Sequence, residues 1–149
     1  MRTLDQMLCF DLYAASRAVT ALYRPLLEPL GLTYPQYLVL VTMPEQEALS
    51  VKQLAALLQL DHGTLSPLLR RMEQAGQLTR TRSSADERVV EVRLSADGRR
   101  LRHEFERVQC EVEESLGLGD ADLGELRRTL QRMTGQVRAR LGDLEVSGR

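Results

Sequence analysis

The chain has 149 residues, a formal net charge of −1 at pH 7, 43% hydrophobic residues and 28% charged residues, which is ordinary for a globular protein with one substantial core. No apolar run approaches the ~20 residues that a membrane-spanning helix needs, and Asp5 and Asp11 interrupt the segment where a signal peptide would be apolar. We therefore expect a cytoplasmic protein whose two cysteines are free thiols rather than a structural disulfide.

The first 30 residues predict an amphipathic helix. Thr3 and Gln6 have the spacing of a capping box, so the helix is expected to begin near Leu4. Apolar residues then recur every three or four positions, which predicts one apolar stripe along the helix. Two prolines and Gly31 are expected to end it.

Three short helices are expected next. Thr33 is the predicted cap of the first, and Ser50 of the second. The second and third helices, joined by a tight turn, have the pattern of a helix-turn-helix. Either Asp61 or Thr64 can cap the third helix, and Pro67 favours Thr64 because proline is tolerated in a first turn. The predicted inward positions of this helix pair are Val51, Leu54, Leu57, Leu58, Leu65, Leu68, Leu69 and Met72.

The second half of the chain predicts a hairpin and more helices. Residues 78–84 and 89–95 alternate polar and apolar side chains, which predicts a β-hairpin of two strands at most. Ser95 is expected to cap one long helix over residues 96–116. A last helix carries apolar residues at near-heptad spacing from Leu123 to Leu144.

This order of elements predicts a mainly α fold with a small β-hairpin. We expect a single domain over residues 1–149, with a winged helix-turn-helix at about 46–98 and dimerisation helices at about 3–30 and 96–145.

The charge distribution favours a nucleic-acid partner. Residues 52–102 hold ten basic and six acidic side chains, a local balance of +4, so the flanks sum to −5. At the hairpin tip, Arg88 can enter a DNA minor groove, and Asp86 can hold its guanidinium in place. On the second helix of the pair, the residues expected to face DNA are His62, Gly63, Thr64, Ser66, Arg70 and Arg71.

The segment "SVKQLAALLQLDHGTLSPLLRRMEQAGQLTRTRSSADERVVEVRLSADG" resembles the winged-helix core of MarR-family repressors. Asp86-x-Arg88 followed by "VRLSADG" is similar to the wing motif of that family. Together with "LCFDLYAASRAVTALYRPLLEPLGLTYPQYLVL", it resembles the organic-hydroperoxide-sensing (OhrR-like) branch over about residues 8–104. His62 stands where that branch usually has Ser, and Asp11 replaces a commonly apolar residue.

The resemblance implies a homodimer that binds an inverted-repeat DNA operator and is released when an organic hydroperoxide oxidises an N-terminal cysteine. The sensing cysteine of the branch falls on Cys9, and the two phenols that hydrogen-bond its thiolate fall on Tyr23 and Tyr34. In branch members with a second, late cysteine, that residue bridges to the sensing cysteine of the other subunit. Cys110 has about the corresponding position.

Local sequence does not activate Cys9. It would be near the sixth residue of its helix, beyond the first turn in which the helix dipole acts, so phenols brought in by folding would have to stabilise a thiolate. A packed core thiol is the alternative, and Phe10, Tyr13 and Tyr37 are interpreted as core or pocket lining.

Two other functions remain open. One is a repressor of the same fold that responds to a small-molecule ligand, and the other is a thiol peroxidase, which would leave the basic helix-turn-helix unexplained. The cysteines and histidines lack metal-ligand spacing, so no metal or cofactor is predicted.

Overall fold

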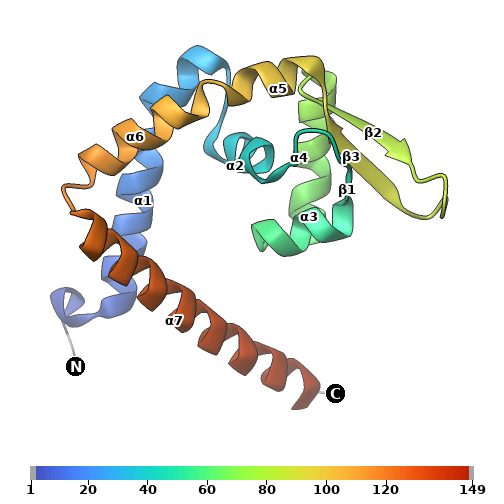
Figure 1. Ribbon diagram of the computed structural model, residues 1–149. Helices are drawn as coiled ribbons and strands as arrows, with labels where there is room; N and C mark the ends of the chain where they lie inside the picture. The colour runs from blue at the N-terminus through green and yellow to red at the C-terminus, as the bar shows by residue number, and fades with distance from the viewer. Residues whose placement is uncertain (1–2, 148–149) are drawn as a thin grey trace. The chain divides into compact units, whose positions relative to one another are not determined.

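The computed structural model describes residues 3–147 and is helical apart from one small sheet (Figure 1). For Asp5 and residues 143–147 only the backbone is described. The chain divides into two compact units, Met1–Val112 and Glu113–Arg149. The first unit holds the helix-turn-helix and the sheet in the order of a winged helix, which confirms the predicted fold class.

The first long helix, α1 (Leu8–Leu27), begins four residues later than predicted. The segment Leu4–Gln6 forms one 3-10 turn, and Met7 is extended with φ −106° and ψ 103°. The Thr3 side chain makes no capping hydrogen bond. The predicted start near Leu4 is therefore wrong, because a capping pattern without its hydrogen bond does not offset the cost of starting a helix there.

A short turn connects α1 to the next helix. The turn consists of a 3-10 segment, Glu28–Leu30, and Gly31, whose φ of +65° glycine adopts without strain. The next helix, α2 (Tyr34–Thr42), begins directly after Thr33, which is the predicted cap position. The backbone N–H of Thr33 donates to Gln36 Oε1 at 2.8 Å.

The helix pair consists of α3 (Val51–Leu58) and α4 (His62–Gln74). The predicted Ser50 cap is confirmed, since its hydroxyl oxygen accepts a hydrogen bond from the third helical residue. The predicted inward residues are buried or half-buried, with one exception. Leu57 is 60% exposed because it precedes the inward Leu58 by one residue, or about 100° around a helix.

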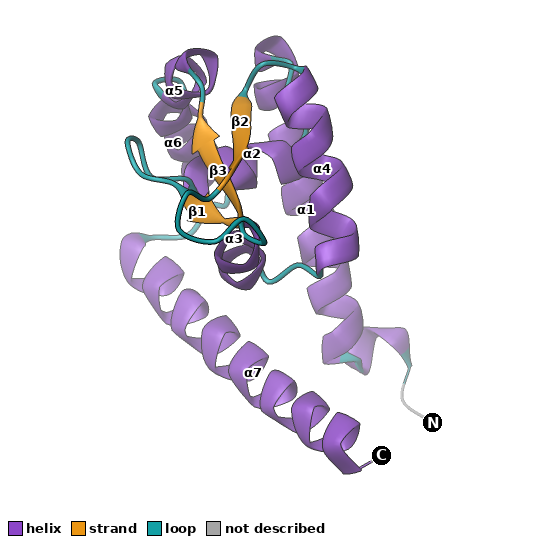
Figure 2. Cartoon of the chain, turned by 90° about the vertical axis from the view of Figure 1, so that its right-hand side faces the viewer, coloured by secondary structure: helices purple, strands orange, loops and turns teal. Residues whose placement is uncertain are grey.

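The sheet has three antiparallel strands in the order β1-β3-β2 (Figure 2). They are β1 (Leu49–Ser50), β2 (Leu78–Arg82) and β3 (Val90–Leu94). The predicted hairpin is confirmed, with Leu78 opposite Leu94. The limit of two strands is wrong, because β1 also pairs with β3. A strand of two residues is too short to show alternation in a sequence.

The predicted long helix after the hairpin is two helices, α5 (Ala96–Arg102) and α6 (Phe105–Ser115). The N–H groups of His103 and Glu104 donate to carbonyls three residues back, at 3.2 and 3.1 Å. Such bonds tighten the chain into a 3-10 turn, which ends the first helix and redirects the second.

Two close contacts hold α5 and α6 to the rest of the first unit. Phe105 packs edge-on against Tyr37, with ring centroids 4.7 Å apart, and both side chains are buried. Such an aromatic pair contributes about 0.5–1.5 kcal/mol beyond its buried area. Gly98 lies so close to the turn before β2 that an added Cβ would overlap the Gln77 carbonyl oxygen.

The second unit consists mainly of α7 (Asp120–Ser147), which follows Gly117 at a φ of +65°. Its apolar stripe is only partly covered: Leu126, Val137 and Leu141 are 45–54% exposed. The predicted last member of the stripe, Leu144, lies outside the described side chains.

Within residues 3–147, every helix is too short or too polar to cross a membrane. In the same part of the chain, no three His, Cys, Asp or Glu side chains gather as they would around a metal ion.

Candidate nucleic-acid interface and thiol site

The N-terminus of α4 is held by Asp61. Its carboxylate accepts the Thr64 hydroxyl at 2.6 Å and the Thr64 backbone N–H at 2.8 Å. These hydrogen bonds, the hydroxyl first, lower the pKa of the Asp61 carboxyl. The expected cap at Thr64 is therefore wrong: Asp61 accepts both hydrogen bonds of Thr64 and is the cap, and Pro67 lies inside the helix. Gly63 keeps the cap accessible, since a Cβ there would lie 3.1 Å from Asp61 Oδ1.

The outer face of α4 carries the side chains expected to meet DNA. His62 lies over Ser66, with Nδ1 3.2 Å from Oγ. The opposite face of the helix is buried, including Leu65, Leu69 and Met72 at 0% exposure. One face of α4 therefore packs into the core, and the other is exposed to solvent. The solvent face consists of exposed His62, Gly63, Thr64, Arg70 and Arg71 and half-buried Ser66.

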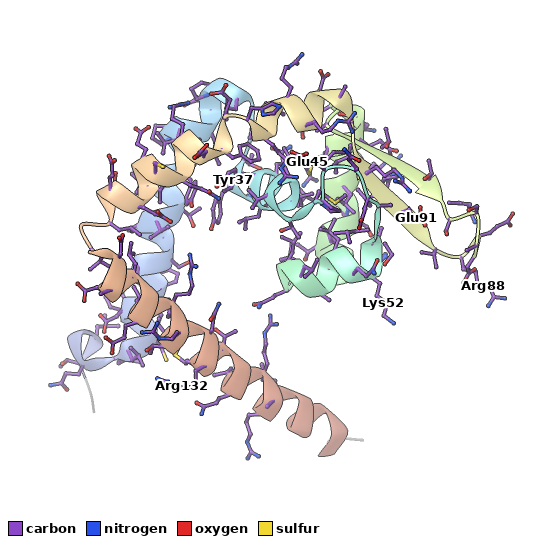
Figure 3. All side chains as sticks on the ribbon, viewed as in Figure 1. Tyr37, Glu45, Lys52, Arg88, Glu91 and Arg132 are labelled. Carbon is purple, nitrogen blue, oxygen red and sulfur yellow. The ribbon has the colours of Figure 1, made fainter. Side chains whose placement is uncertain are left out.

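The wing is the β2–β3 hairpin, and hydrogen bonds close its tip. Arg82 Nη1 donates to the Glu87 carbonyl at 3.0 Å. Asp86 Oδ1 accepts the backbone N–H of Arg88 at 3.0 Å, which is an Asx turn. The sequence predicts that Asp86 holds the guanidinium of Arg88. In the structure, Asp86 instead binds the backbone N–H of Arg88. The Arg88 side chain is exposed and points away from the sheet (Figure 3).

The ten basic residues of the basic segment fall into two groups. Six have partners within the chain: Arg80, Arg82, Arg93, Arg99, Arg100 and Arg102. The other four basic residues of this segment have neither a hydrogen bond nor an ion pair with the described residues: Lys52, Arg70, Arg71 and Arg88. These four come from the start of α3, from α4 and from the wing tip. Free positive charge is what a DNA backbone attracts.

Lys52 is a candidate that sequence reasoning missed. It is exposed, two residues after the Ser50 cap, and points away from α3 (Figure 3). Its position just inside a predicted helix start was visible in the sequence. An isolated lysine in the first helix of the pair nevertheless carries no motif that separates it from an ordinary surface residue.

Cys9 is an exposed, free thiol in the first turn of α1. Because the helix begins at Leu8, Cys9 is its second residue, so the expectation that it lies beyond the first turn is wrong. Unpaired N–H groups and the helix dipole favour negative charge in a first turn. Of the three aromatic residues interpreted as core or pocket lining, Tyr37 is buried in the core, whereas Phe10 and Tyr13 are 41% and 57% exposed and do not belong to the core of this chain.

Tyr23 and Tyr34 form a phenol pair in the first unit, with ring centroids 4.6 Å apart. Burial raises the pKa of the Tyr34 hydroxyl, which keeps it protonated and able to donate. The chain does not bring both phenols to its own Cys9. Cys9 and Tyr23 are fourteen residues apart on α1, or about 21 Å along the axis. Cys110 is a second exposed, free thiol, on α6.

Comparison with known proteins identifies the family. The family model "Transcriptional regulator SarA/Rot" matches residues 21–105, from within α1 through α5 to the start of α6. The "Organic hydroperoxide resistance transcriptional regulator" of Bacillus subtilis is 52% identical over 99 residues, which are 66% of this chain and 67% of that protein. The HTH-type transcriptional regulator TtmR of Methylorubrum extorquens is 41% identical over 145 residues, 97% and 74% of the two chains.

Solved structures of DNA-bound proteins are also similar to this chain. Reduced AbfR bound to DNA is similar with a TM-score of 0.72 and 30% identity, covering 90% of this chain and 94% of that one. Overoxidised AbfR bound to DNA gives a TM-score of 0.66 and 33% identity, covering 87% and 94%. AbfR is a protein of Staphylococcus epidermidis. The chain therefore belongs to the SarA/Rot-type, MarR-like family of winged-helix, DNA-binding transcriptional regulators.

Proposed function

We propose that this protein is a homodimeric transcriptional repressor that binds an inverted-repeat operator while Cys9 is reduced and leaves it when an organic hydroperoxide oxidises Cys9. The observation that carries the proposal is an exposed thiol in the first turn of α1 together with a phenol pair elsewhere in the fold. The name of the Bacillus subtilis relative, which refers to organic hydroperoxide resistance, supports the choice of oxidant.

The sensor requires two chains. Because about 21 Å of helix separates Cys9 from Tyr23, the phenols that bond a Cys9 thiolate belong to the second subunit. Dimerisation also covers apolar side chains near the start of α1, where Leu8 is 63% and Phe10 is 41% exposed. The dimer thus assembles the thiol and its hydrogen-bond donors at one place.

The chemistry begins at the Cys9 sulfur. The thiolate attacks the terminal oxygen of the hydroperoxide, an S–O bond forms and the O–O bond breaks. Cys9 is oxidised to sulfenic acid, and the hydroperoxide is reduced to an alcohol after its alkoxide takes a proton from water. The Cys110 thiol of the other subunit then attacks this sulfur, which forms a disulfide and releases water.

The disulfide is the step that we link to operator release. A bridge needs Cα atoms within ~7 Å, so subunits with more widely separated cysteines must rearrange to form it. Rearrangement shifts the two α4 helices relative to each other and loses the operator. An overoxidised form of AbfR is bound to DNA, which favours a disulfide over a higher oxidation state of Cys9 as the releasing form here.

A gel shift with and without cumene hydroperoxide tests the proposal. The probe is an inverted-repeat duplex that the reduced protein has selected from a random DNA pool. We expect oxidant to release the wild type, whereas Cys9→Ser binds the duplex and stays bound. Release of Cys9→Ser at the wild-type dose would contradict the role of Cys9. Hydroperoxide consumption with turnover and without DNA binding would instead indicate a thiol peroxidase.

Cys110→Ser separates the two steps. Oxidised wild type should give a dimer band on a non-reducing gel, which dithiothreitol removes. Cys110→Ser should give no such band and should accumulate over-oxidised Cys9 by mass spectrometry. A monomer band in oxidised wild type, with a small thiol attached to Cys9, would make the protein a one-cysteine sensor.

A repressor that responds to a small-molecule ligand is the second candidate, because the first unit has a groove suited to one. The groove runs between α1 and α2, with Arg17, Arg24 and Tyr34 among its lining residues. Under this alternative, Cys9→Ser would respond to the inducer as the wild type does, and hydroperoxide would release neither protein.

A further inference from the structure

Glu73 joins the recognition helix to the wing. It lies on the last turn of α4, and Arg80 is the third residue of β2. Arg80 Nε donates to Glu73 Oε2 at 2.9 Å, and Nη2 lies 2.8 Å from the same oxygen. The backbone N–H of Arg80 donates to Glu73 Oε1 at 3.2 Å. Both oxygens of one carboxylate therefore bind a single residue of the wing.

The backbone bond to Glu73 lies on the free edge of the sheet. Strand β2 is an edge strand, paired only with β3. Across the hairpin, the N–H of Ser83 donates to the Val89 carbonyl. Because inward and outward N–H groups alternate along an antiparallel strand, the odd-numbered residues of β2 face β3 and Arg80 points its N–H outward. Glu73 thus occupies the position of a missing neighbouring strand.

The Glu73–Arg80 ion pair bridges two elements of the fold. By contrast, the ion pairs of Arg93, Arg100 and Arg107 join residues two to four apart in the sequence. On the outer side of the Glu73–Arg80 pair lies a hollow, also lined by Ser66, Pro67, Arg70 and Gln74. Side chains do not fill this hollow. On this side of the molecule, the ion pair therefore connects α4 to the wing.

We propose that Glu73 is a positioning residue that sets the angle between α4 and the wing. The free cations Arg70 and Arg71 on α4 and Arg88 at the wing tip then meet one DNA duplex together. Contacts on one rigid body bind more tightly than contacts on loosely joined parts, because the second contact costs less ordering. In this arrangement, Arg80 is the residue of the wing that Glu73 binds. The inference rests on DNA binding by the reduced protein and not on hydroperoxide sensing.

A double-mutant cycle tests this role. The cycle combines Glu73→Ala with Arg88→Ala and uses the duplex selected by the reduced protein, under reducing conditions. In the wild-type background, Arg88→Ala should weaken binding about 10-fold. In the Glu73→Ala background the same change should cost less than about 3-fold, because the wing no longer presents Arg88 to its groove. The matched control, Gln74→Ala, lines the same hollow and should leave the full effect of Arg88→Ala.

The ratio distinguishes positioning from simple destabilisation. A loss of folded protein lowers binding alike with and without Arg88, so an undiminished Arg88 effect in Glu73→Ala overturns the proposal. Glu73→Gln keeps an acceptor for the Arg80 N–H but loses the charge, and it should give an intermediate ratio. Since no oxidant is present, failure of this cycle leaves the hydroperoxide proposal intact, and the reverse also holds.

Amide hydrogen exchange of the free protein is a readout that does not depend on DNA. Glu73→Ala should accelerate exchange at the Arg80 N–H severalfold and leave Thr79 and Thr81, which face β3, unchanged. Unchanged exchange at Arg80 would overturn the bridge. Equal acceleration along all of β2 and β3 would mean that Glu73 only stabilises the sheet.

Discussion

The winged-helix core buries most of its large apolar side chains, whereas the helices near the two ends of the chain expose many of theirs. Among the described residues, eleven large hydrophobic side chains are exposed, and only Leu57 and Val90 belong to the core. The other nine lie before or within the first half of α1, or on and just before α7: Leu4, Met7, Leu8, Phe10, Tyr13, Leu118, Leu126, Val137 and Leu141.

This contrast separates what one chain completes from what it leaves open. In the core, α4 buries its whole apolar face, and internal partners orient most of the arginines. At the ends, apolar stripes and the Cys9 thiol remain uncovered within their units. The winged-helix core therefore completes its own packing within one chain. Under the proposed function, the thiol site needs a second chain to complete it.

Charging the stripe of α7 should produce the largest effect. Met133→Glu puts a carboxylate among apolar residues that we expect a partner to cover, so the dimer should dissociate. Operator affinity should fall more than about 100-fold, because the two half-sites must be bound together. Light scattering and a gel shift measure both. Gln131→Glu, an exposed change on the same helix, is the control. If Met133→Glu or Leu130→Glu remained dimeric, the dimer interface would lie elsewhere.

A pair of glycine substitutions probes the packing difference directly. Gly98→Ala forces a methyl group onto the Gln77 carbonyl, and overpacking of this kind should lower the free energy of unfolding by about 1–3 kcal/mol. Gly135→Ala on α7 meets no atom within 4 Å and should raise it by up to about 1 kcal/mol, through helix propensity. Urea denaturation measures both, and equal effects would contradict the contrast in packing.

Removing the free cation of the wing should have a moderate effect on binding alone. Arg88→Ala should weaken operator binding about 10-fold. If Arg88 also neutralises phosphate, the slope of log affinity against log salt should flatten by ~0.9 per contact. Arg100→Ala, which removes a cation already paired with Asp97, is the control and should change neither. Unchanged affinity and slope in Arg88→Ala would exclude the wing from the interface.

The smallest effect is expected at the cap of α4. Hydrogen bonds from Thr64 lower the pKa of Asp61 in the folded protein, so its stabilising contribution is present above the unfolded pKa of 3.8 and is lost as pH falls through the lower, folded value. Asp61→Ala should lower the melting temperature slightly at neutral pH, and the difference from wild type should shrink in acid. Glu47→Ala, an exposed loop change, is the control, and a pH-independent difference would show that the charge of Asp61 contributes nothing.

Elements with a local signal were predictable. Ser50 and Ser95 accept hydrogen bonds at the starts of α3 and α5, as their positions before helical patterns indicated. The hairpin and the buried face of α4 followed from periodicity. Three of the errors share a cause. The late start of α1, the Asp61 cap and the break at His103 each depend on which of several competing hydrogen bonds forms, and residue type alone did not decide that.

The exposure of most candidate site residues could be predicted from the sequence, whereas Lys52 and the hydrogen bonds of the sites could not. The exposed face of α4 and the position of Arg88 followed from the pattern, whereas the use of Asp86 on backbone rather than guanidinium did not. The Glu73–Arg80 pair has no sequence signal, because the six residues between its members cross a helix end, a turn and a strand start. Such pairs become visible only when tertiary contacts are known.

The capped edge of β2 also has a consequence for solubility. An unpaired strand edge is a template on which another chain can add a strand, and this is a common start of aggregation. At Arg80, an outward N–H that an incoming strand would need is already bound to Glu73, and the carboxylate and guanidinium obstruct the approach. We therefore expect the contact between Glu73 and Arg80 also to oppose the addition of a strand from another copy of this protein at this point of the edge.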